Sequence, residues 1–284
     1  MGRAEGKVVV ITGAARGQGR SHAVRLAEEG ADIIAIDICR DIEIVEYPMG
    51  TAEELQETAE LVEKAGRRIV TRQADVRDRA ALAAAIEEGV AELGPLDVVI
   101  ANAGISPVGP NPINAFTDVV DVNLVGALNT VHAALPHTTE NASIILIGSV
   151  ASFFGAPGDP GMPTILGPGG VAYAYAKQMM GTYIDWLAPF LSSSGRRINV
   201  IHPTNVDTIM LHNERMYRIF RPDLEHPTRA ETEATFALIH GMPVPYIDPI
   251  DVSHAIVYLA SDESRYVTGQ QMRVDSGALA KAGK

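Results

Sequence analysis

The sequence has little of what a secreted, membrane-bound or nucleic-acid-binding protein needs. Its single cysteine, Cys39, excludes an internal disulfide and gives no sign of secretion. The first residues, MGRAEGKVVVITG, contain an apolar run too short for a signal peptide or a spanning helix, and Gly6 replaces the Ser or Thr of a myristoylation signal. The net charge is -12 and no basic run is longer than a pair, so a nucleic-acid backbone would be repelled. We therefore expect a cytoplasmic protein that acts without a membrane or nucleic acid.

Patterns that bind a metal are also missing. The 8 histidines show neither an H-E-x-x-H motif nor another paired-ligand spacing, so no metal site is expected. His202 precedes Pro203 at the end of an apolar run, and we expect it to be packed or hydrogen-bonded instead.

Hydrophobic residues, by contrast, are plentiful and regularly placed. They make up 46% of 284 residues, enough for the core of one domain spanning 1–284. Apolar runs rich in β-branched residues recur as KVVVIT, DIIAID, RIVTRQAD, LDVVIANA, SIILIG, RINVIHP and QQMRVD. Segments with helical periodicity lie between them, at 18–29, 51–65, 78–93, 115–134, 171–192 and 249–260. This alternation predicts an α/β fold, a doubly wound, mainly parallel seven-stranded Rossmann sheet with helices on both faces.

Three stretches interrupt the alternation. The segment ICRDIEIVEYPMGT, at 38–51, and the Gly- and Pro-rich 153–170 are expected to be insertions. For 38–51, a decorative surface loop competes with a cover over a bound ligand. The region 205–247 is long enough to carry its own helices, and its apolar residues fit either core packing or a substrate lid: Met210, Met216, Phe220 and Met242.

A glycine-rich turn, TGAARGQG, follows the first apolar run. Gly13, Gly17 and Gly19 would let the backbone approach a pyrophosphate at a helix N-terminus. Their spacing differs from the commoner G-x-G-x-x-G, but the position of the turn inside a βαβ unit supports dinucleotide binding. The second run ends at Asp37, which would accept hydrogen bonds from the adenosine ribose and repel a 2′-phosphate. The basic side chain of Arg16 could attract the 2′-phosphate of NADP, but the negative charge of Asp37 would repel it directly. NAD is therefore the expected cofactor.

The stretch VAYAYAKQM, at 171–179, holds two tyrosines and a lysine. At 3.6 residues per turn, Tyr173 and Lys177 share one helix face, whereas Tyr175 points to another side. A nearby ammonium lowers the pKa of a phenol, so Tyr173 is the candidate general acid or base. Alone, so short a pattern favours a helix with two packed aromatics and a solvated lysine. Tyr175 is expected to pack or to contact another subunit.

Taken in order, the motifs resemble those of the short-chain dehydrogenase/reductase family, classical type, over almost the whole chain. They are TGAARGQG, AD before Val76, NAG at 102–104, DVNLVG, IGSVAS and Y-x-x-x-K. The resemblance implies that Tyr173 is the general acid/base and that Lys177 modulates its pKa and binds the ribose. It also implies that Ser149 contacts the substrate oxygen and that Asn123 supports a proton-relay water. The cofactor-binding residues that it implies, together with those argued above, are Gly13, Arg16, Gly17, Gln18, Gly19, Asp37, Ile38, Asp75, Val76, Asn102, Ala103, Gly104, Tyr173, Lys177, Pro203, Val206 and Thr208.

Some features depart from the family pattern or narrow it. Pro203-Thr204 stands where Pro-Gly is usual, and Ser149 and Tyr173 are farther apart than in most members. Four features resemble the mycofactocin-associated subfamily, which includes carveol dehydrogenase-like enzymes. They are the 38–51 insertion and the segments TGAARGQGRSHA, HPTNVDT and ASDESRYVTGQQMRVDSG. That resemblance implies tightly bound NAD and reoxidation by a mycofactocin-type redox carrier. The resemblance to the wider family implies a dimer interface along the 173–191 helix, and a homotetramer is expected.

The sequence thus predicts an NAD-dependent alcohol dehydrogenase. Its substrate would be an apolar, terpenoid- or steroid-like secondary alcohol that is interconverted with its ketone. The alternatives are an NADPH-dependent ketone or 3-oxoacyl reductase and a non-catalytic NAD-binding sensor. Cofactor preference would decide between the two enzymes, and turnover of any secondary alcohol would exclude the sensor.

Overall fold

The computed structural model describes residues 2–154 and 162–284. In this part of the chain one sheet runs through the molecule, with strand order β3-β2-β1-β4-β5-β6-β7 and every neighbouring pair parallel. The strands are β1 (Val8–Thr12), β2 (Asp32–Asp37), β3 (Ile69–Gln73), β4 (Leu96–Ala101), β5 (Thr138–Ile147), β6 (Arg197–Pro203) and β7 (Gln271–Val274). Each lies within or overlaps a predicted apolar run, so the doubly wound Rossmann-type prediction is confirmed.

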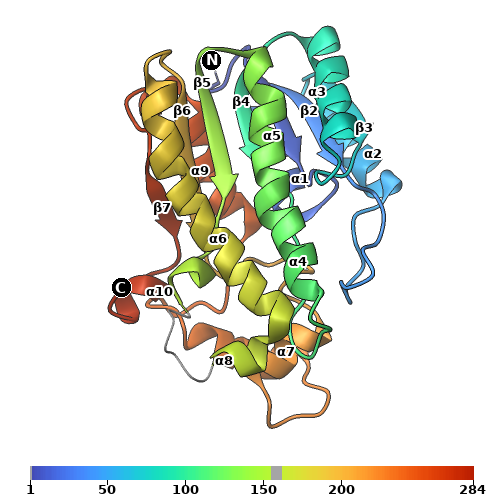
Figure 1. Ribbon diagram of the computed structural model, residues 1–284, viewed down its shortest axis with the longest axis vertical. Helices are drawn as coiled ribbons and strands as arrows, with labels where there is room; N and C mark the ends of the chain where they lie inside the picture. Colours follow the sequence, from blue (N-terminus) through green and yellow to red (C-terminus); the bar gives the residue numbers. More distant parts are fainter. Residues whose placement is uncertain (1, 155–161) are drawn as a thin grey trace.

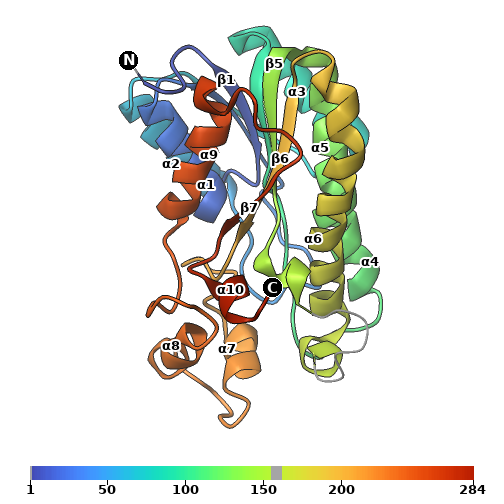
Figure 2. The same ribbon diagram turned by 90° about the vertical axis from the view of Figure 1, so that its left-hand side faces the viewer.

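Helices cover both faces of the sheet (Figures 1 and 2). One face carries α1 (Gly17–Glu28), α2 (Ala52–Lys64) and α9 (Pro249–Ala260). The other carries α3 (Arg79–Leu93), α4 (Ala115–Val120), α5 (Gly126–Ala134) and α6 (Met162–Ser192). Successive strand residues therefore enter different cores: Val10 and Ile34 pack into one, and Ile11 and Ile33 into the other. Because both faces are buried, the central strands β1, β2 and β4 are nearly continuous apolar runs, whereas the edge strand β7 alternates in exposure.

The N-terminus of α1 differs from those of α2 and α3. In α2 the Thr51 side chain accepts a hydrogen bond from Glu54 N, and in α3 Asp78 accepts from Ala80 N and Ala81 N. The cap of α1 is Arg16, which makes no capping hydrogen bond, and the first turn holds no acidic residue. The first N–H groups of α1 are thus left for another acceptor.

The helix predicted at 115–134 is interrupted by one π-helical turn, η1 (Asp121–Val125), between α4 and α5. Asn123 lies in this turn and is fully buried. Its side chain accepts from Ile105 N and donates to Ile105 O, both at 2.8 Å. The turn therefore fixes the chain that leaves the carboxyl end of β4. π-helical turns are common at functional sites.

Most of the remaining elements lie in the C-terminal half. The 155–161 part of the predicted 153–170 insertion lies outside the described residues, and the chain from Met162 onward belongs to α6. At Gly167, where φ is 66°, α6 is kinked; a Cβ there would lie 1.8 Å from Gly109 O. The region 205–247 carries two helices, as predicted, which lie beyond the end of the sheet (Figures 1 and 2). The other elements are α7 (Glu214–Phe220), α8 (Arg229–Ala237), α10 (Ala278–Lys281) and the 3-10 helices η2 (Leu135–His137), η3 (Val150–Phe153) and η4 (Asp262–Ser264).

Among the helices of residues 2–154 and 162–284, none is both long enough and apolar enough to cross a bilayer.

Candidate active site

A cavity of about 530 Å³ opens at the carboxyl ends of the strands. It lies where the strand order reverses, because β1 has β2 on one side and β4 on the other. Open α/β sheets bind ligands at this point. The predicted cofactor residues that line the cavity are Gly13, Arg16, Gly17, Gln18, Gly19, Asp37, Ile38, Asp75, Val76, Asn102, Ala103, Gly104 and Thr208. Of the remainder, Pro203, Val206, Tyr173 and Lys177 do not line it.

The glycine-rich turn forms a cradle that side chains would fill. Gly13 and Gly17 have φ of 70° and 56°, in the left-handed region that favours glycine. A Cβ on Gly19 would lie 2.0 Å from Gly13 O. The amide oxygen of Gln18 is buried and finds no hydrogen-bond partner among the described residues. The glycine cradle and the uncapped start of α1 fit the pyrophosphate of a dinucleotide.

Asp37 is held in place at another part of the cavity wall. Its side chain is largely buried, and the Asp37 carboxylate accepts hydrogen bonds from Ala15 N at 3.0 Å and Cys39 N at 3.1 Å. The two N–H groups fix the carboxylate at the end of β2, where ribose hydroxyls would be expected. This geometry is consistent with the role predicted for Asp37.

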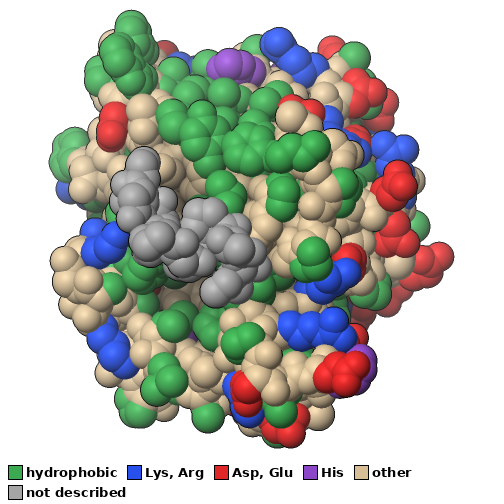
Figure 3. Space-filling view, turned by 60° about the horizontal axis from the view of Figure 1, so that its bottom comes forward, with side chains coloured by type: hydrophobic (Ala, Val, Ile, Leu, Met, Phe, Trp, Pro, Cys, Tyr) green, Lys and Arg blue, Asp and Glu red, His purple; other side chains and the backbone are tan. Residues whose placement is uncertain are grey.

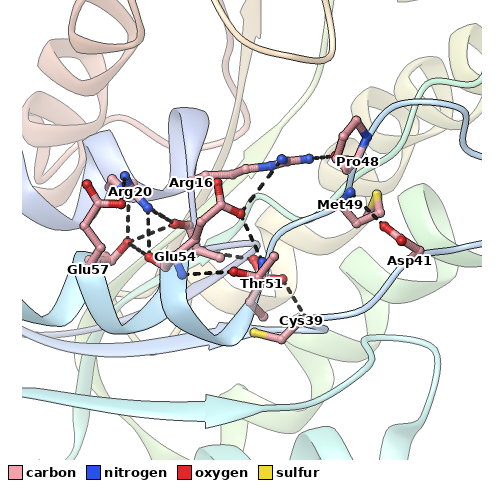
Figure 4. A network of polar contacts seen from close by, with 12 residues as sticks. Arg16, Arg20, Cys39, Asp41, Pro48, Met49, Thr51, Glu54 and Glu57 are labelled. Atoms are coloured by element: carbon pink, nitrogen blue, oxygen red, sulfur yellow. Dashed lines mark hydrogen bonds and ion pairs between the residues drawn. The ribbon is translucent and has the colours of Figure 1, made fainter.

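The Arg16 guanidinium is not free to meet a phosphate. It donates to the Pro48 carbonyl and lies 3.9 Å from the Glu54 carboxylate (Figure 4). Arg16 therefore fastens the 38–51 segment to the glycine-rich turn, a contact that the sequence did not indicate.

Asp75 is tied to two arginines. Its carboxylate accepts from Arg77 at 2.7 Å and from Arg40 at 3.1 Å. Burial alone would raise the pKa of Asp75, but these hydrogen bonds outweigh burial and lower the pKa. The carboxylate stays ionised, and Arg40 gives the 38–51 segment a second attachment.

The 38–51 segment lies along the cavity. Its members on the cavity wall include Ile42, Tyr47, Pro48, Met49 and Gly50. The Tyr47 hydroxyl accepts from Ser106 N at 2.9 Å, and Glu46 pairs with Arg215 in α7. Apart from Ile38, sequence reasoning had not named these positions as site residues, although the apolar residues among the acids had marked the segment as a candidate cover.

The predicted catalytic side chains come together at the Gly104 end of the cavity. Lys177 and Tyr173 share one face of α6, with Lys177 Nζ 5.6 Å from the centre of the Tyr173 ring. Lys177 is buried and donates to Ile147 O at 2.7 Å, and its Nζ lies 3.6 Å from where a Cβ on Gly104 would be. Ser149 lies just past β5, where it caps the N-terminus of η3, and its side chain contacts Tyr173.

Two expectations about the tyrosines have different outcomes. Tyr175 does lie on another side of α6, 45% exposed, with its ring 6.0 Å from that of Phe116. The expectation that Lys177 lowers the pKa of Tyr173 is not met in this structure. Burial raises the pKa of Tyr173, and its contact with Ser149 only partly opposes this. Burial also lowers the pKa of Lys177 to about 7, which weakens the ammonium on which the expectation relied.

Thr204, which stands where the family usually has glycine, makes a contact that glycine could not make. The Thr204 hydroxyl lies 2.7 Å from His240 Nε2, while His240 Nδ1 lies 2.6 Å from Val244 O. A threonine in place of the usual glycine thus anchors the loop that follows α8. Val206 pairs with Ile247 in a short β-bridge. Next to it, the cavity wall includes Asp207 and Ile209, which the sequence analysis did not name, and Met210, which it assigned to core packing or a substrate lid.

Comparison with known proteins gives extensive matches. Residues 13–278 match the family described as enoyl-(acyl carrier protein) reductase. The (-)-trans-carveol dehydrogenase of Rhodococcus erythropolis is 42% identical over 288 residues, covering 99% of this chain and 100% of that protein. The crystal structure of carveol dehydrogenase from Mycobacterium avium in complex with NAD has a TM-score of 0.91 and 45% identity, covering 99% of this chain and 100% of that one. A short chain dehydrogenase from Mycobacterium paratuberculosis bound to NAD has a TM-score of 0.85 and 38% identity, covering 98% of this chain and 100% of that one.

Proposed function

The chain belongs to the short-chain dehydrogenase/reductase family, and from that premise we propose that it is an NAD-dependent dehydrogenase that interconverts a secondary alcohol and its ketone. The observation that carries the proposal is the arrangement of one cavity. Ser149, Tyr173 and Lys177 meet beside its Gly104 end without lining it, and Asp37 is fixed on its wall at the end of β2.

The wall of the cavity fits NAD in detail. The turn at Gly13 to Gly19 and the free N–H groups of α1 would hold the pyrophosphate. Asp37 would accept hydrogen bonds from the adenosine ribose, and its charge would repel the 2′-phosphate of NADP. Bound there, NAD would supply the hydride acceptor for alcohol oxidation. The alternative enzyme is a reductase that prefers NADPH. Arg16 is already bonded to Pro48, so it would contribute little to binding the 2′-phosphate of NADPH.

The catalytic residues would orient the alcohol and move its proton. The Ser149 hydroxyl would hold the substrate oxygen, and the Tyr173 oxygen would take the hydroxyl proton as general base. In the buried pair, a neutral phenol with a neutral amine has the same net charge as a phenolate with an ammonium. Transfer of one proton from Tyr173 to Lys177 therefore yields the base without moving net charge into the site. The Asn123 side chain bonds to both main-chain groups of Ile105, and we propose that a relay water binds to the Asn123 main-chain carbonyl.

The substrate that we propose is an apolar, cyclic alcohol of the terpenoid class. The related (-)-trans-carveol dehydrogenase supports this class by its name. In Figure 3 hydrophobic side chains gather in the upper part of the view, and in the lower part they lie scattered among charged ones. In the 205–247 region, which we regard as a substrate lid, Ile209, Leu238 and Met242 are exposed.

The cofactor would be held tightly by the 38–51 segment. The segment is joined to the body through Pro48, Arg40, Tyr47 and Glu46, and it forms part of the cavity wall. A cover of this kind slows dissociation, where most differences in affinity arise. Retained NAD would need reoxidation in place, and a mycofactocin-type redox carrier is the partner that we propose for this step.

A homotetramer is the expected assembly. The helix α6 exposes Tyr175, Trp186 and Phe190, at 45%, 73% and 75%. Exposed aromatics along one helix are typical of a protein–protein contact. Light scattering on the purified protein would measure the number of subunits.

One experiment tests the central proposal. The protein is purified without added cofactor and denatured, and the released nucleotide is identified by mass spectrometry. The native protein is then given (-)-trans-carveol and a panel of secondary alcohols, with dichlorophenolindophenol as electron acceptor. We expect NAD in the released fraction and dye reduction with at least one cyclic alcohol. Release of NADP, or no turnover of any alcohol, would contradict the proposal.

A further inference from the structure

His202 is a buried imidazole beside the proposed catalytic serine, and the mechanism above makes no use of it. It lies near the end of β6, is 0% exposed, and faces the chain that leaves β5. A Cβ on Gly148 would lie 2.5 Å from His202 Nδ1, so only a glycine lets the ring approach this backbone so closely. Phe153 packs against the ring edge to face, with centroids 4.9 Å apart. The expected packed and hydrogen-bonded histidine is therefore confirmed.

The hydrogen bonds around His202 allow one consistent proton assignment. Nδ1 lies 3.2 Å from Ser149 N, 3.2 Å from Ser152 Oγ and 3.0 Å from Ser149 O, and Nε2 lies 3.2 Å from Gln271 Oε1. The Ser152 hydroxyl donates to Ser149 O at 2.6 Å, so that carbonyl is satisfied without a proton on Nδ1. No other acceptor for the Ser149 N–H is present in residues 2–154 and 162–284. If Nδ1 carried the proton, this N–H would have no acceptor, so the proton belongs on Nε2, which donates to Gln271.

Gln271 is itself held against the helix that carries the catalytic tyrosine. A Cβ on Gly181 would lie 2.6 Å from Gln271 Oε1, so the Gln271 amide lies directly on α6. Hydrogen bonds thus lead from Gln271 in β7 through His202 in β6 to the main chain of Ser149. The same Gln271 amide packs against the helix that positions Tyr173.

We propose that His202, with its tautomer fixed by Gln271, is a positioning residue that holds the Ser149 main chain so that the Ser149 hydroxyl meets Tyr173. This inference rests on the proposed function. The role needs Nδ1 to stay an acceptor, and therefore needs a neutral ring. Burial lowers the pKa of His202 and outweighs the contacts with Ser149 and Gln271, which raise it, while the charges of Lys177 and Arg273 act in the same direction as burial. Because the contact with Ser149 lowers the pKa of Tyr173, a displaced Ser149 would leave a phenol that is harder to ionise.

Two substitutions at one position separate positioning from packing. His202→Leu keeps an apolar bulk but cannot accept from Ser149 N, whereas His202→Asn places an amide oxygen near the site of Nδ1. We expect His202→Leu to lower kcat with (-)-trans-carveol by ~10-fold to ~10²-fold, the cost of a misplaced reacting group, with bound NAD per chain unchanged. His202→Asn should recover most of the activity. The matched control is His22→Leu, since His22 is equally buried, bonds to Ser253 on the other side of the sheet, and should leave kcat unchanged.

A second measurement does not depend on the substrate. Tyrosine is isotope-labelled at the ring carbon that bears the hydroxyl, and the Tyr173 NMR signal is assigned by its loss in Tyr173→Phe. We expect the Tyr173 pKa to rise in His202→Leu but not in His202→Asn or His22→Leu. If His202→Leu does not fold, Gln271→Leu should give a smaller rise, because the ring loses the acceptor that fixes its tautomer.

The outcomes separate this inference from the proposed function. Full turnover by Tyr173→Phe would sink the proposed function. An inactive Tyr173→Phe beside a His202→Leu enzyme with wild-type kcat and Tyr173 titration would overturn only the positioning role. Equal losses in His202→Leu and His202→Asn, with a normal Tyr173 titration, would reduce His202 to a packing residue and likewise overturn it.

Discussion

The two ends of the cavity are closed in different ways. At the catalytic end, Lys177 is buried in a helix that packs on the sheet and bonds to the carbonyl of Ile147. At the other end, the 38–51 segment is held by separate polar contacts near the surface, among them Arg40 with Asp75 and Glu46 with Arg215. Burial of a core fixes the first end, whereas exposed ion pairs contribute only about 0–1 kcal/mol each to the second. The catalytic end should thus be rigid, and the cover should be able to release.

This difference predicts which measurement each end controls. Substitutions at the catalytic end should change the rate of turnover and leave NAD in place. Substitutions at the covered end should change which cofactor is bound and how long it stays, with a smaller effect on turnover.

The largest effect is expected at Tyr173. Tyr173→Phe removes the proton acceptor and should lower kcat by at least ~10²-fold, with NAD content unchanged. Tyr175→Phe is the matched control, because Tyr175 lies on another side of α6 and should be nearly as active as the wild type. Both are measured by steady-state turnover and by NAD released on denaturation. Equal losses from the two substitutions would mean that the wrong phenol was chosen or that neither is catalytic.

The next largest effect is expected at Asp37. Asp37→Ala removes charge-assisted hydrogen bonds to the ribose, worth roughly 1.5–3 kcal/mol each, so NAD binding should weaken about 10- to 100-fold. The preference for NAD over NADP should fall as the charge is lost, while Arg16 stays bonded to Pro48. Binding of both nucleotides to the apo protein is measured by calorimetry. A wild-type preference for NADP would show that the role given to Asp37 is wrong.

The sequence could predict those features of each cavity end that depend on local periodicity, but not those that depend on tertiary contacts. The strands, the glycine-rich turn and the shared face of Tyr173 and Lys177 depend on local periodicity, so they could be predicted. The π-helical turn at 121–125 could not, since its residues show no pattern that distinguishes it from an α-helix. The direction of the Tyr173 pKa shift was wrong because burial is a tertiary property. The bond of Tyr47 to Ser106 N joins segments distant in sequence and has no local signal.

The third effect concerns the cover itself. Replacing residues 39–50 by a brief turn removes several polar contacts, each worth about 0.5–1.5 kcal/mol, so NAD should dissociate at least about tenfold faster. The rate is followed by exchange of bound NAD for isotope-labelled NAD. The kcat at saturating NAD should change far less, because Tyr173 and Lys177 are untouched. Unchanged retention, or wild-type protein that is purified without NAD, would show that the segment is a surface decoration.

The smallest effect is expected where the cover meets the 205–247 region. Arg215 in α7 pairs with Glu46, and both side chains are partly exposed. Arg215→Gln should therefore speed NAD exchange by no more than about fivefold, and the difference should shrink at high salt, where exposed charges are screened. The matched control is Arg218→Gln in the same helix, since Arg218 pairs with Glu214 rather than with the cover. If α7 and the cover open together, an apolar alcohol that closes the lid should slow NAD exchange in the wild type more than in Arg215→Gln. Equal slowing in the two proteins would show that the cover and the lid move independently.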